Sequence, residues 1–207
     1  KKEYLMCWGG KKYSLILHDI SPQKKIKINI EMQMFIDGDF PVLVNFVEGA
    51  GCIFVNTQYG NFFLYEATRG VLIFKTKLLD DPCIFAAKNS KMPGYYYITR
   101  GGKLLQVNID ADNLLPYMMT NLRNVDNIVD VCVNLAGKYN LPGAEKIFVG
   151  LFKNHIAQSN FVEAAKICAE SPGEILRNME TIQIFQSSQG NPLPAMVYFQ
   201  TIMAKGK

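Results

Sequence analysis

The sequence of residues 141–186 is LPGAEKIFVGLFKNHIAQSNFVEAAKICAESPGEILRNMETIQIFQ, which is typical of short helices joined by very short breaks. Pro142 is compatible with a first helical turn, where a missing N–H costs no hydrogen bond. Apolar residues then recur at steps of three and four along one face, at Ile147, Phe148, Leu151, Phe152 and Ile156. This periodicity predicts an amphipathic helix whose apolar face packs against another element.

A second helix is predicted after the break at Gln158-Ser159. Asn160 stands three residues before Glu163, the spacing of a capping box, in which each side chain bonds a free backbone amide. The helix that follows has small and apolar residues at Phe161, Ala164, Ala165, Ile167 and Cys168. Because the connection is so short, the two helices must run antiparallel, and the alanine pair lets their backbones approach closely. Helical hairpins of this kind are the unit of α-solenoids.

Two runs in this region have side-chain identities that helix packing alone does not require. They are Asn140-Leu141-Pro142-Gly143-Ala144-Glu145 and the Ala-Gln-x-Asn-aromatic-x-Glu-Ala-Ala-Lys pattern of residues 157–166. With these residues the chain resembles the clathrin heavy chain family, in the linker that follows the family's N-terminal propeller. The match continues at Pro172, Ile175-Leu176-Arg177 and Phe185-Gln186, and the end of the propeller is matched at Asp39-Phe40-Pro41-Val42, Tyr59-Gly60, Leu64-Tyr65-Glu66 and Asn113-Leu114-Leu115-Pro116-Tyr117. The resemblance therefore covers nearly the whole chain.

Up to about Asn108 the sequence has a different pattern, of short β-rich runs separated by Gly, Pro, Asn and Asp. The predicted strands are residues 4–8, 14–20, 26–34, 42–47, 52–56, 61–66, 71–78, 83–87, 95–99 and 103–109. So many strands in so short a stretch leave no room for the crossover helices of an α/β fold.

A weak internal repeat supports a propeller. At an offset of 41 residues, Pro41 matches Pro82, Gly60 matches Gly101, and Leu64 matches Leu105. This period suits a four-stranded blade, which in propellers takes about 40 to 50 residues. Glycine at the hairpins permits turns that need a positive φ.

The predicted architecture is therefore all-β and then all-α. Residues 1–110 are expected to form the last blades of a partial β-propeller, and residues 111–207 an α-solenoid of zigzag helical hairpins. The resemblance implies that the complete propeller has seven blades and that the helices are the linker and the start of the leg. A propeller needs about four to eight blades to close, and these strands supply about two and a half, so the sequence is expected to be a fragment.

The α-solenoid is expected to contain further helices. A short helix or a turn is predicted to start at residue 114, and helices are predicted at residues 126–138, 178–187 and 193–205. The helix at 126–138 is apolar on more than half of its circumference, which indicates that it is packed on both sides.

The composition excludes several classes of protein. The hydrophobic content of 49% in 207 residues is enough for a sizeable core. Five dispersed cysteines, an odd number, favour reduced and buried thiols over a disulfide framework. No signal peptide is found, and no apolar run approaches the roughly 18 residues of a membrane span. The net charge of +4 is spread along the chain, which favours solvated loops over a nucleic-acid partner.

The sequence contains no recognisable catalytic or cofactor motif. His18 and His155 have no Cys, Asp or Glu at metal-ligand spacing, and both are expected to be satisfied structural histidines. Gly49-x-Gly51 is expected to be a hairpin turn, and Asp80-Asp81 before Pro82 a solvated turn. There is no Cys-x-x-Cys, Walker phosphate loop or Gly-x-Ser-x-Gly elbow. We therefore expect no cofactor, no metal and no enzyme activity.

The resemblance implies a structural scaffold of clathrin-type vesicle coats. In that family the propeller recruits adaptor and accessory proteins through short linear motifs, and the helical leg extends into the lattice. It also implies light-chain binding and self-assembly through parts of the leg outside this sequence, and contact with membranes only through adaptors. The expected location is the cytoplasmic face of coated vesicles and coated pits, in endocytosis and intracellular protein transport. The rival interpretation is another propeller-plus-solenoid scaffold, such as a coatomer-type coat or a nuclear-pore protein.

Two residues are candidates for peptide binding. When the chain is aligned with the family, Trp8 and Ile16 fall at positions that line a secondary groove between middle blades. An extended peptide in such a groove adds main-chain hydrogen bonds at a strand edge and fills apolar pockets. The alternative is that Trp8 is ordinary propeller core. The family's main peptide groove, between early blades, is expected to lie outside this sequence.

Overall fold

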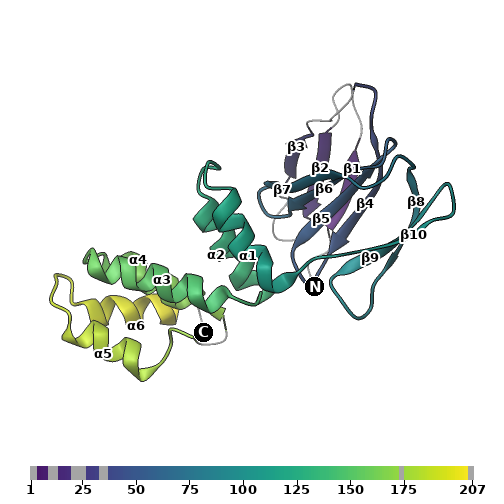
Figure 1. The fold of residues 1–207 in the computed structure, drawn as a ribbon. Coiled ribbons are helices and arrows are strands. Elements are labelled where there is room, and N and C mark those ends of the chain that lie inside the picture. The colour runs from purple at the N-terminus through teal and green to yellow at the C-terminus, as the bar shows by residue number, and fades with distance from the viewer. Residues whose placement is uncertain (1–3, 9–13, 20–26, 33–36, 173–174, 205–207) are drawn as a thin grey trace. The chain divides into compact units, whose positions relative to one another are not determined.

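The structure is a computed structural model that describes residues 4–8, 14–19, 27–32, 37–172 and 175–204. In the first three strands it describes the side chains of Leu15, Ile16 and residues 29–31 only. Strands occupy the chain as far as Asn108 and helices begin at Ala111 (Figure 1). The predicted change from an all-β to an all-α region is therefore confirmed. Two compact units, Lys1–Asp110 and Ala111–Lys207, follow this division.

The described residues of the β unit form three antiparallel sheets. Sheet A has the order β1 (Tyr4–Trp8), β2 (Ser14–Asp19), β3 (Lys27–Glu31). Sheet B has the order β4 (Pro41–Val47), β5 (Cys52–Thr57), β6 (Asn61–Glu66), β7 (Leu72–Lys77). In sheet C, β9 (Gly94–Thr99) lies between β8 (Cys83–Lys88) and β10 (Leu104–Asn108). Within each sheet, strands that are consecutive in sequence are paired, which is the meander of a propeller blade.

Sheet B is covered on both faces, which explains why every residue of β5 and β6 is buried. On one face, Leu15 and Ile30 of sheet A join a core cluster with Ile53, Val55, Phe63 and Tyr65. On the other face, the Phe54 ring meets the Tyr95 ring of sheet C, with centroids 6.3 Å apart. A sheet that is packed on both sides has the environment of a middle blade.

The α unit contains six helices among its described residues. They are α1 (Ala111–Asn121), α2 (Ile128–Tyr139), α3 (Ala144–Ala157), α4 (Phe161–Glu170), α5 (Met179–Ser187) and α6 (Pro194–Ala204). Helices that are consecutive in sequence pack together at α1–α2, α2–α3, α3–α4 and α5–α6, and alternate helices pack together at α2–α4 and α4–α6. Stacking of this kind is that of a solenoid. No helix in the described part of the chain is long and apolar enough to cross a membrane.

The ends of α3 and α4 differ from the sequence prediction in detail. Helix α3 begins at Ala144, not at Pro142, because Gly143 has a left-handed conformation with φ of 77° and ends the preceding turn. The predicted cap of α4 is half right. Asn160 Oδ1 accepts the N–H of Glu163 at 3.4 Å, but the Glu163 carboxylate bonds Lys166 Nζ at 2.6 Å.

The small residues of α4 lie where helices pack closely. Ala164 and Ala165 are both 0% exposed, and α4 contacts both α3 and α6. On α3, Phe148 and Phe152 are the buried members of the predicted apolar face, whereas Ile147 and Leu151 are half-buried. The predicted close approach at the alanine pair is therefore confirmed by burial.

Ala165→Leu is expected to destabilise the α unit by about 1 to 3 kcal/mol, because added methylene groups in a filled contact force neighbouring helices apart. Thermal melting followed by far-ultraviolet circular dichroism measures the effect. Ala157→Leu, at an exposed position near the end of α3, is the matched control and should leave the melting temperature nearly unchanged. Equal melting of both variants would show that the contact at Ala165 tolerates a larger side chain.

Candidate peptide-binding surface

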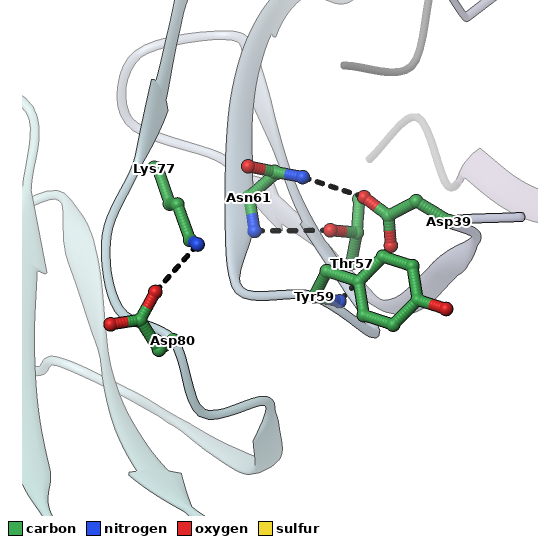
Figure 2. A network of polar contacts seen from close by, with 6 residues as sticks. All are labelled: Asp39, Thr57, Tyr59, Asn61, Lys77 and Asp80. Atoms are coloured by element: carbon green, nitrogen blue, oxygen red, sulfur yellow. Dashed lines mark hydrogen bonds and ion pairs between the residues drawn. The ribbon is translucent and has the colours of Figure 1, made fainter. Parts of the chain in front are cut away.

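A buried carboxylate fixes the turn between β5 and β6 (Figure 2). Asp39 is 0% exposed, and its Oδ1 accepts the N–H groups of Phe40 and Tyr59, each at 3.0 Å. Its Oδ2 accepts the side-chain amide of Asn61 at 2.7 Å, and the N–H of Asn61 donates to Thr57 Oγ1 at 3.0 Å. Three donors therefore stabilise the carboxylate, and the start of β4 is tied to the tip of the next hairpin.

The same arrangement recurs in sheet C, at the turn between β9 and β10. Asp81 Oδ2 accepts the N–H of Gly101 at 2.6 Å, as Asp39 accepts that of Tyr59. Thr99 Oγ1 accepts the N–H of Lys103 at 3.1 Å, as Thr57 accepts that of Asn61. Both blades therefore use an aspartate and a threonine to hold the hairpin at one end of the sheet.

The structural repeat has an offset of 42 residues, not the predicted 41. Gly102, with φ of 81°, is the counterpart of Gly60, with φ of 76°. The register shift after Pro41 in β4 likewise recurs after Cys83 in β8. Matching Pro41 with Pro82 gives the offset of 41, because the anchoring aspartate stands two residues before Pro41 but directly before Pro82.

Asp80 and Asp81 lie in a bend before Pro82 as predicted, with Asp80 exposed and Asp81 half-buried, but the hairpin contact of Asp81 was not predicted. Asp80 is exposed and forms an ion pair with Lys77 (Figure 2). Asp81 holds the hairpin, and hydrogen bonds from the Thr99 hydroxyl and the Gly101 N–H keep the pKa of its carboxyl below the usual range. The equal spacing of Asp39 to Tyr59 and of Asp81 to Gly101 is the sequence signal that would have shown it.

Sheet C has one covered and one open face. Its covered face contacts sheet B, since the Tyr95 hydroxyl donates to the Phe46 carbonyl at 2.9 Å. On the open face, Phe85 pairs with Ile98 and Ile98 with Leu104, so these side chains form a row across the three strands. They are 56%, 40% and 69% exposed. An apolar row of this kind can accept an extended peptide or another sheet. It was not predicted from the sequence.

The two predicted peptide-binding residues both lie in sheet A. Trp8 is the last residue of β1 and pairs with Leu15, whereas Ile16 pairs with Cys7 of β1 and Asn29 of β3. Ile16 is half-buried, while its neighbour Leu15 is 0% exposed in the core cluster shared with sheet B. The Trp8 side chain lies outside the described residues. The assignment of these two residues to a peptide groove stays a prediction.

The described residues contain no group of three or more His, Cys, Asp and Glu that could hold a metal ion. Cys52, Cys83, Cys132 and Cys168 are buried and form no disulfide, and burial raises the pKa of the Cys168 thiol to about 12. Such thiols are poor nucleophiles at neutral pH. His155 was predicted to be a structural histidine with its hydrogen bonds satisfied. This is not fully the case, because its Nδ1 is buried without a hydrogen-bond partner among the described atoms.

Blade-type sheets with a repeated hairpin anchor, followed by stacked helical hairpins, define a fold of the propeller-plus-solenoid class. Comparison with known proteins narrows the class. The family profile described as Clathrin-H-link matches residues 140–202, within the α unit. Because clathrin heavy chains that are 34% identical also match 82% of the chain, the chain belongs to the clathrin heavy chain family.

The relatives match both units of the chain. Clathrin heavy chain 1 of Oryza sativa subsp. japonica is 34% identical over 172 residues, which are 82% of this chain and 10% of that protein. The clathrin heavy chain of Dictyostelium discoideum has the same identity and coverage. The probable clathrin heavy chain of Schizosaccharomyces pombe is 28% identical over 204 residues, 95% of this chain and 12% of that protein. The chain thus spans about a tenth of the length of these relatives.

Proposed function

We propose that this chain is part of a structural scaffold of a clathrin-type vesicle coat. Its β unit belongs to a propeller that recruits adaptor and accessory proteins through short linear motifs, and its α unit begins a helical leg that extends into the lattice. The observation that carries the proposal is the similarity to clathrin heavy chains across the strand-to-helix boundary, over 82% of the chain. A coatomer-type or nuclear-pore scaffold would not be expected to match at this identity.

The remaining parts of the proposal follow from the same similarity. Clathrin light chain and further copies of the heavy chain are the proposed partners of the leg, and contact with membranes is made through adaptors. The proposed location is the cytoplasmic face of coated vesicles and coated pits, in endocytosis and intracellular transport. The role is noncatalytic, which agrees with the buried thiols of the described residues.

Peptide titration tests recruitment by the β unit. The chain should bind a labelled peptide of alternating leucines and acidic residues, because an interblade groove offers apolar pockets and lysine side chains favour carboxylates. A single short peptide buries little surface, so the dissociation constant should be micromolar or weaker, and several motifs must act together in a coat. Fluorescence anisotropy measures the affinity.

Trp8→Ala is the informative variant, because Trp8 is the candidate groove residue with the larger side chain. It should weaken peptide binding while the circular dichroism spectrum is unchanged. Tyr59→Ala is the matched control, since Tyr59 is another aromatic of the β unit, 45% exposed at a hairpin tip. Equal affinity of wild type and Trp8→Ala would remove Trp8 from the groove. Failure of the wild type to bind any such peptide would contradict recruitment by this part of the propeller.

A further inference from the structure

The α unit contains a groove that the proposed function does not use. It lies between α1 and α3, each of which packs against α2, and has a volume of about 550 Å³. Its apolar lining comes from Pro116 and Met119 of α1 and from Ile147 and Leu151 of α3. The side chains of Met119, Ile147 and Leu151 are only half-buried, so α1 and α3 leave an apolar surface open between them.

The lining residues form a straight surface on which a helix can pack. On α3 the lining residues recur at steps of three and four from Lys146 to Asn154, and so form a straight stripe along the helix. The stripe is a little more than two helical turns or about 12 Å long, at about 1.5 Å per residue. Gly150 lies in its middle, and nothing is within 4 Å of the place where its Cβ would stand. The absent side chain lets another backbone approach α3 closely.

One wall of the groove is positively charged. Lys146 lines the groove, and Lys153 follows seven residues later, two turns along the same side of α3. Both are exposed, and within the described part of the chain neither forms an ion pair. On the opposite wall, Asp112 is the single charged lining residue, at the end where α1 starts. Cationic side chains therefore lie along the α3 side of the groove, and its one carboxylate lies at the start of α1.

We propose that the α1–α3 groove binds an amphipathic helix of a partner protein, whose apolar stripe is flanked on one side by acidic residues seven positions apart. The apolar stripe would pack on Met119, Ile147 and Leu151, with a small residue opposite Gly150. The acidic flank would meet Lys146 and Lys153, and Asp112 would repel it at the other wall, which fixes the orientation of the helix. This is the helix-in-groove mode of recognition.

A synthetic helical peptide tests this assignment with the complete chain. The probe has about 18 residues, a length at which a designed helix forms in water, with leucines and one central alanine on one face and glutamates seven positions apart on one flank. Anisotropy should show saturable binding of the labelled probe. Gly150→Leu should weaken it at least about tenfold, because the new side chain fills the groove. The same variant should keep its fold, since leucine has a better helix propensity than glycine and the space is open.

Charge exchange provides the second arm of the test. The double variant Lys146→Glu, Lys153→Glu should lose binding of the acidic probe and gain binding of a probe with lysines in place of the glutamates. Lys166→Glu, on α4, and Trp8→Ala, in the β unit, are the controls and should bind the acidic probe as the wild type does. Equal affinity of the wild type for the acidic and basic probes, or no effect of Gly150→Leu, would overturn the proposal. A further control probe has a central proline and otherwise the same sequence as the acidic probe. Equal binding of this probe would also overturn the proposal, since the ligand would then not be a helix.

Discussion

Replacing Asp39 by alanine is expected to destabilise the β unit by about 3 kcal/mol, because removal of the carboxylate leaves three donors without an acceptor. One of them, the side-chain amide of Asn61, is buried with its residue at 2% exposure. The other two are the N–H groups of Phe40 and Tyr59. Urea unfolding followed by the fluorescence of Trp8, the single tryptophan of the chain, reports the β unit directly.

The repeat in sheet C provides the matched control for this prediction. Asp81→Ala removes the equivalent carboxylate from a more exposed hairpin, where water can satisfy the freed Gly101 N–H. Its effect on the urea midpoint should therefore be clearly smaller than that of Asp39→Ala. If both variants shifted the midpoint equally, the burial of Asp39 would not be the source of its contribution. Asp39→Asn, which keeps one acceptor oxygen, should fall between the wild type and Asp39→Ala.

The strand and helix pattern could be predicted because it depends on local signals. Gly, Pro, Asn and Asp separate the short runs of the β region. After Asp110 the spacing between apolar residues changes from two residues to three and four. The burial of Ala164 and Ala165 could also be predicted, since small residues suit a close contact between helices. These features need no knowledge of distant parts of the chain.

Other features escaped prediction because they depend on contacts between distant residues. Asp39 reaches Tyr59 across twenty positions, and the sequence shows this only if the two blades are aligned by their aspartates instead of their prolines. Glu163 has the spacing of a capping box but bonds Lys166, which competes for the same carboxylate. Spacing states what a side chain can reach, whereas its choice among partners depends on the packed structure.

The two candidate binding surfaces of the β unit also differ in whether the sequence could predict them. Trp8 and Ile16 came from alignment with a family, not from a pattern in this chain. The apolar row on sheet C was not predicted from the sequence, because the equivalent residues of sheet B are buried or half-buried. Asn56 of sheet B, for example, is 2% exposed, and its counterpart Ile98 of sheet C is 40% exposed. Whether a sheet face is open depends on its neighbours in space.

An aromatic cluster holds the last helices of the α unit together. The Phe185 ring of α5 lies 4.8 Å from the Tyr198 ring of α6 and 5.9 Å from the Phe152 ring of α3. All three side chains are at most 3% exposed. Because Phe185 contacts aromatic residues of two other helices, its removal leaves a cavity that no single side chain can fill.

Phe185→Ala is therefore expected to cost about 3 to 5 kcal/mol, the range for loss of a buried phenylalanine. Thermal melting by far-ultraviolet circular dichroism should show a large fall in the melting temperature of the helices. Phe199→Ala, at a residue of α6 that is 43% exposed, removes the same side chain from the surface and should have a much smaller effect. Since the two units are separately compact, the urea midpoint followed by Trp8 fluorescence should shift less than the urea midpoint followed by the helical circular dichroism signal. Equal losses for both phenylalanines would contradict a core role for Phe185, and equal shifts of both signals would show that the two units unfold together.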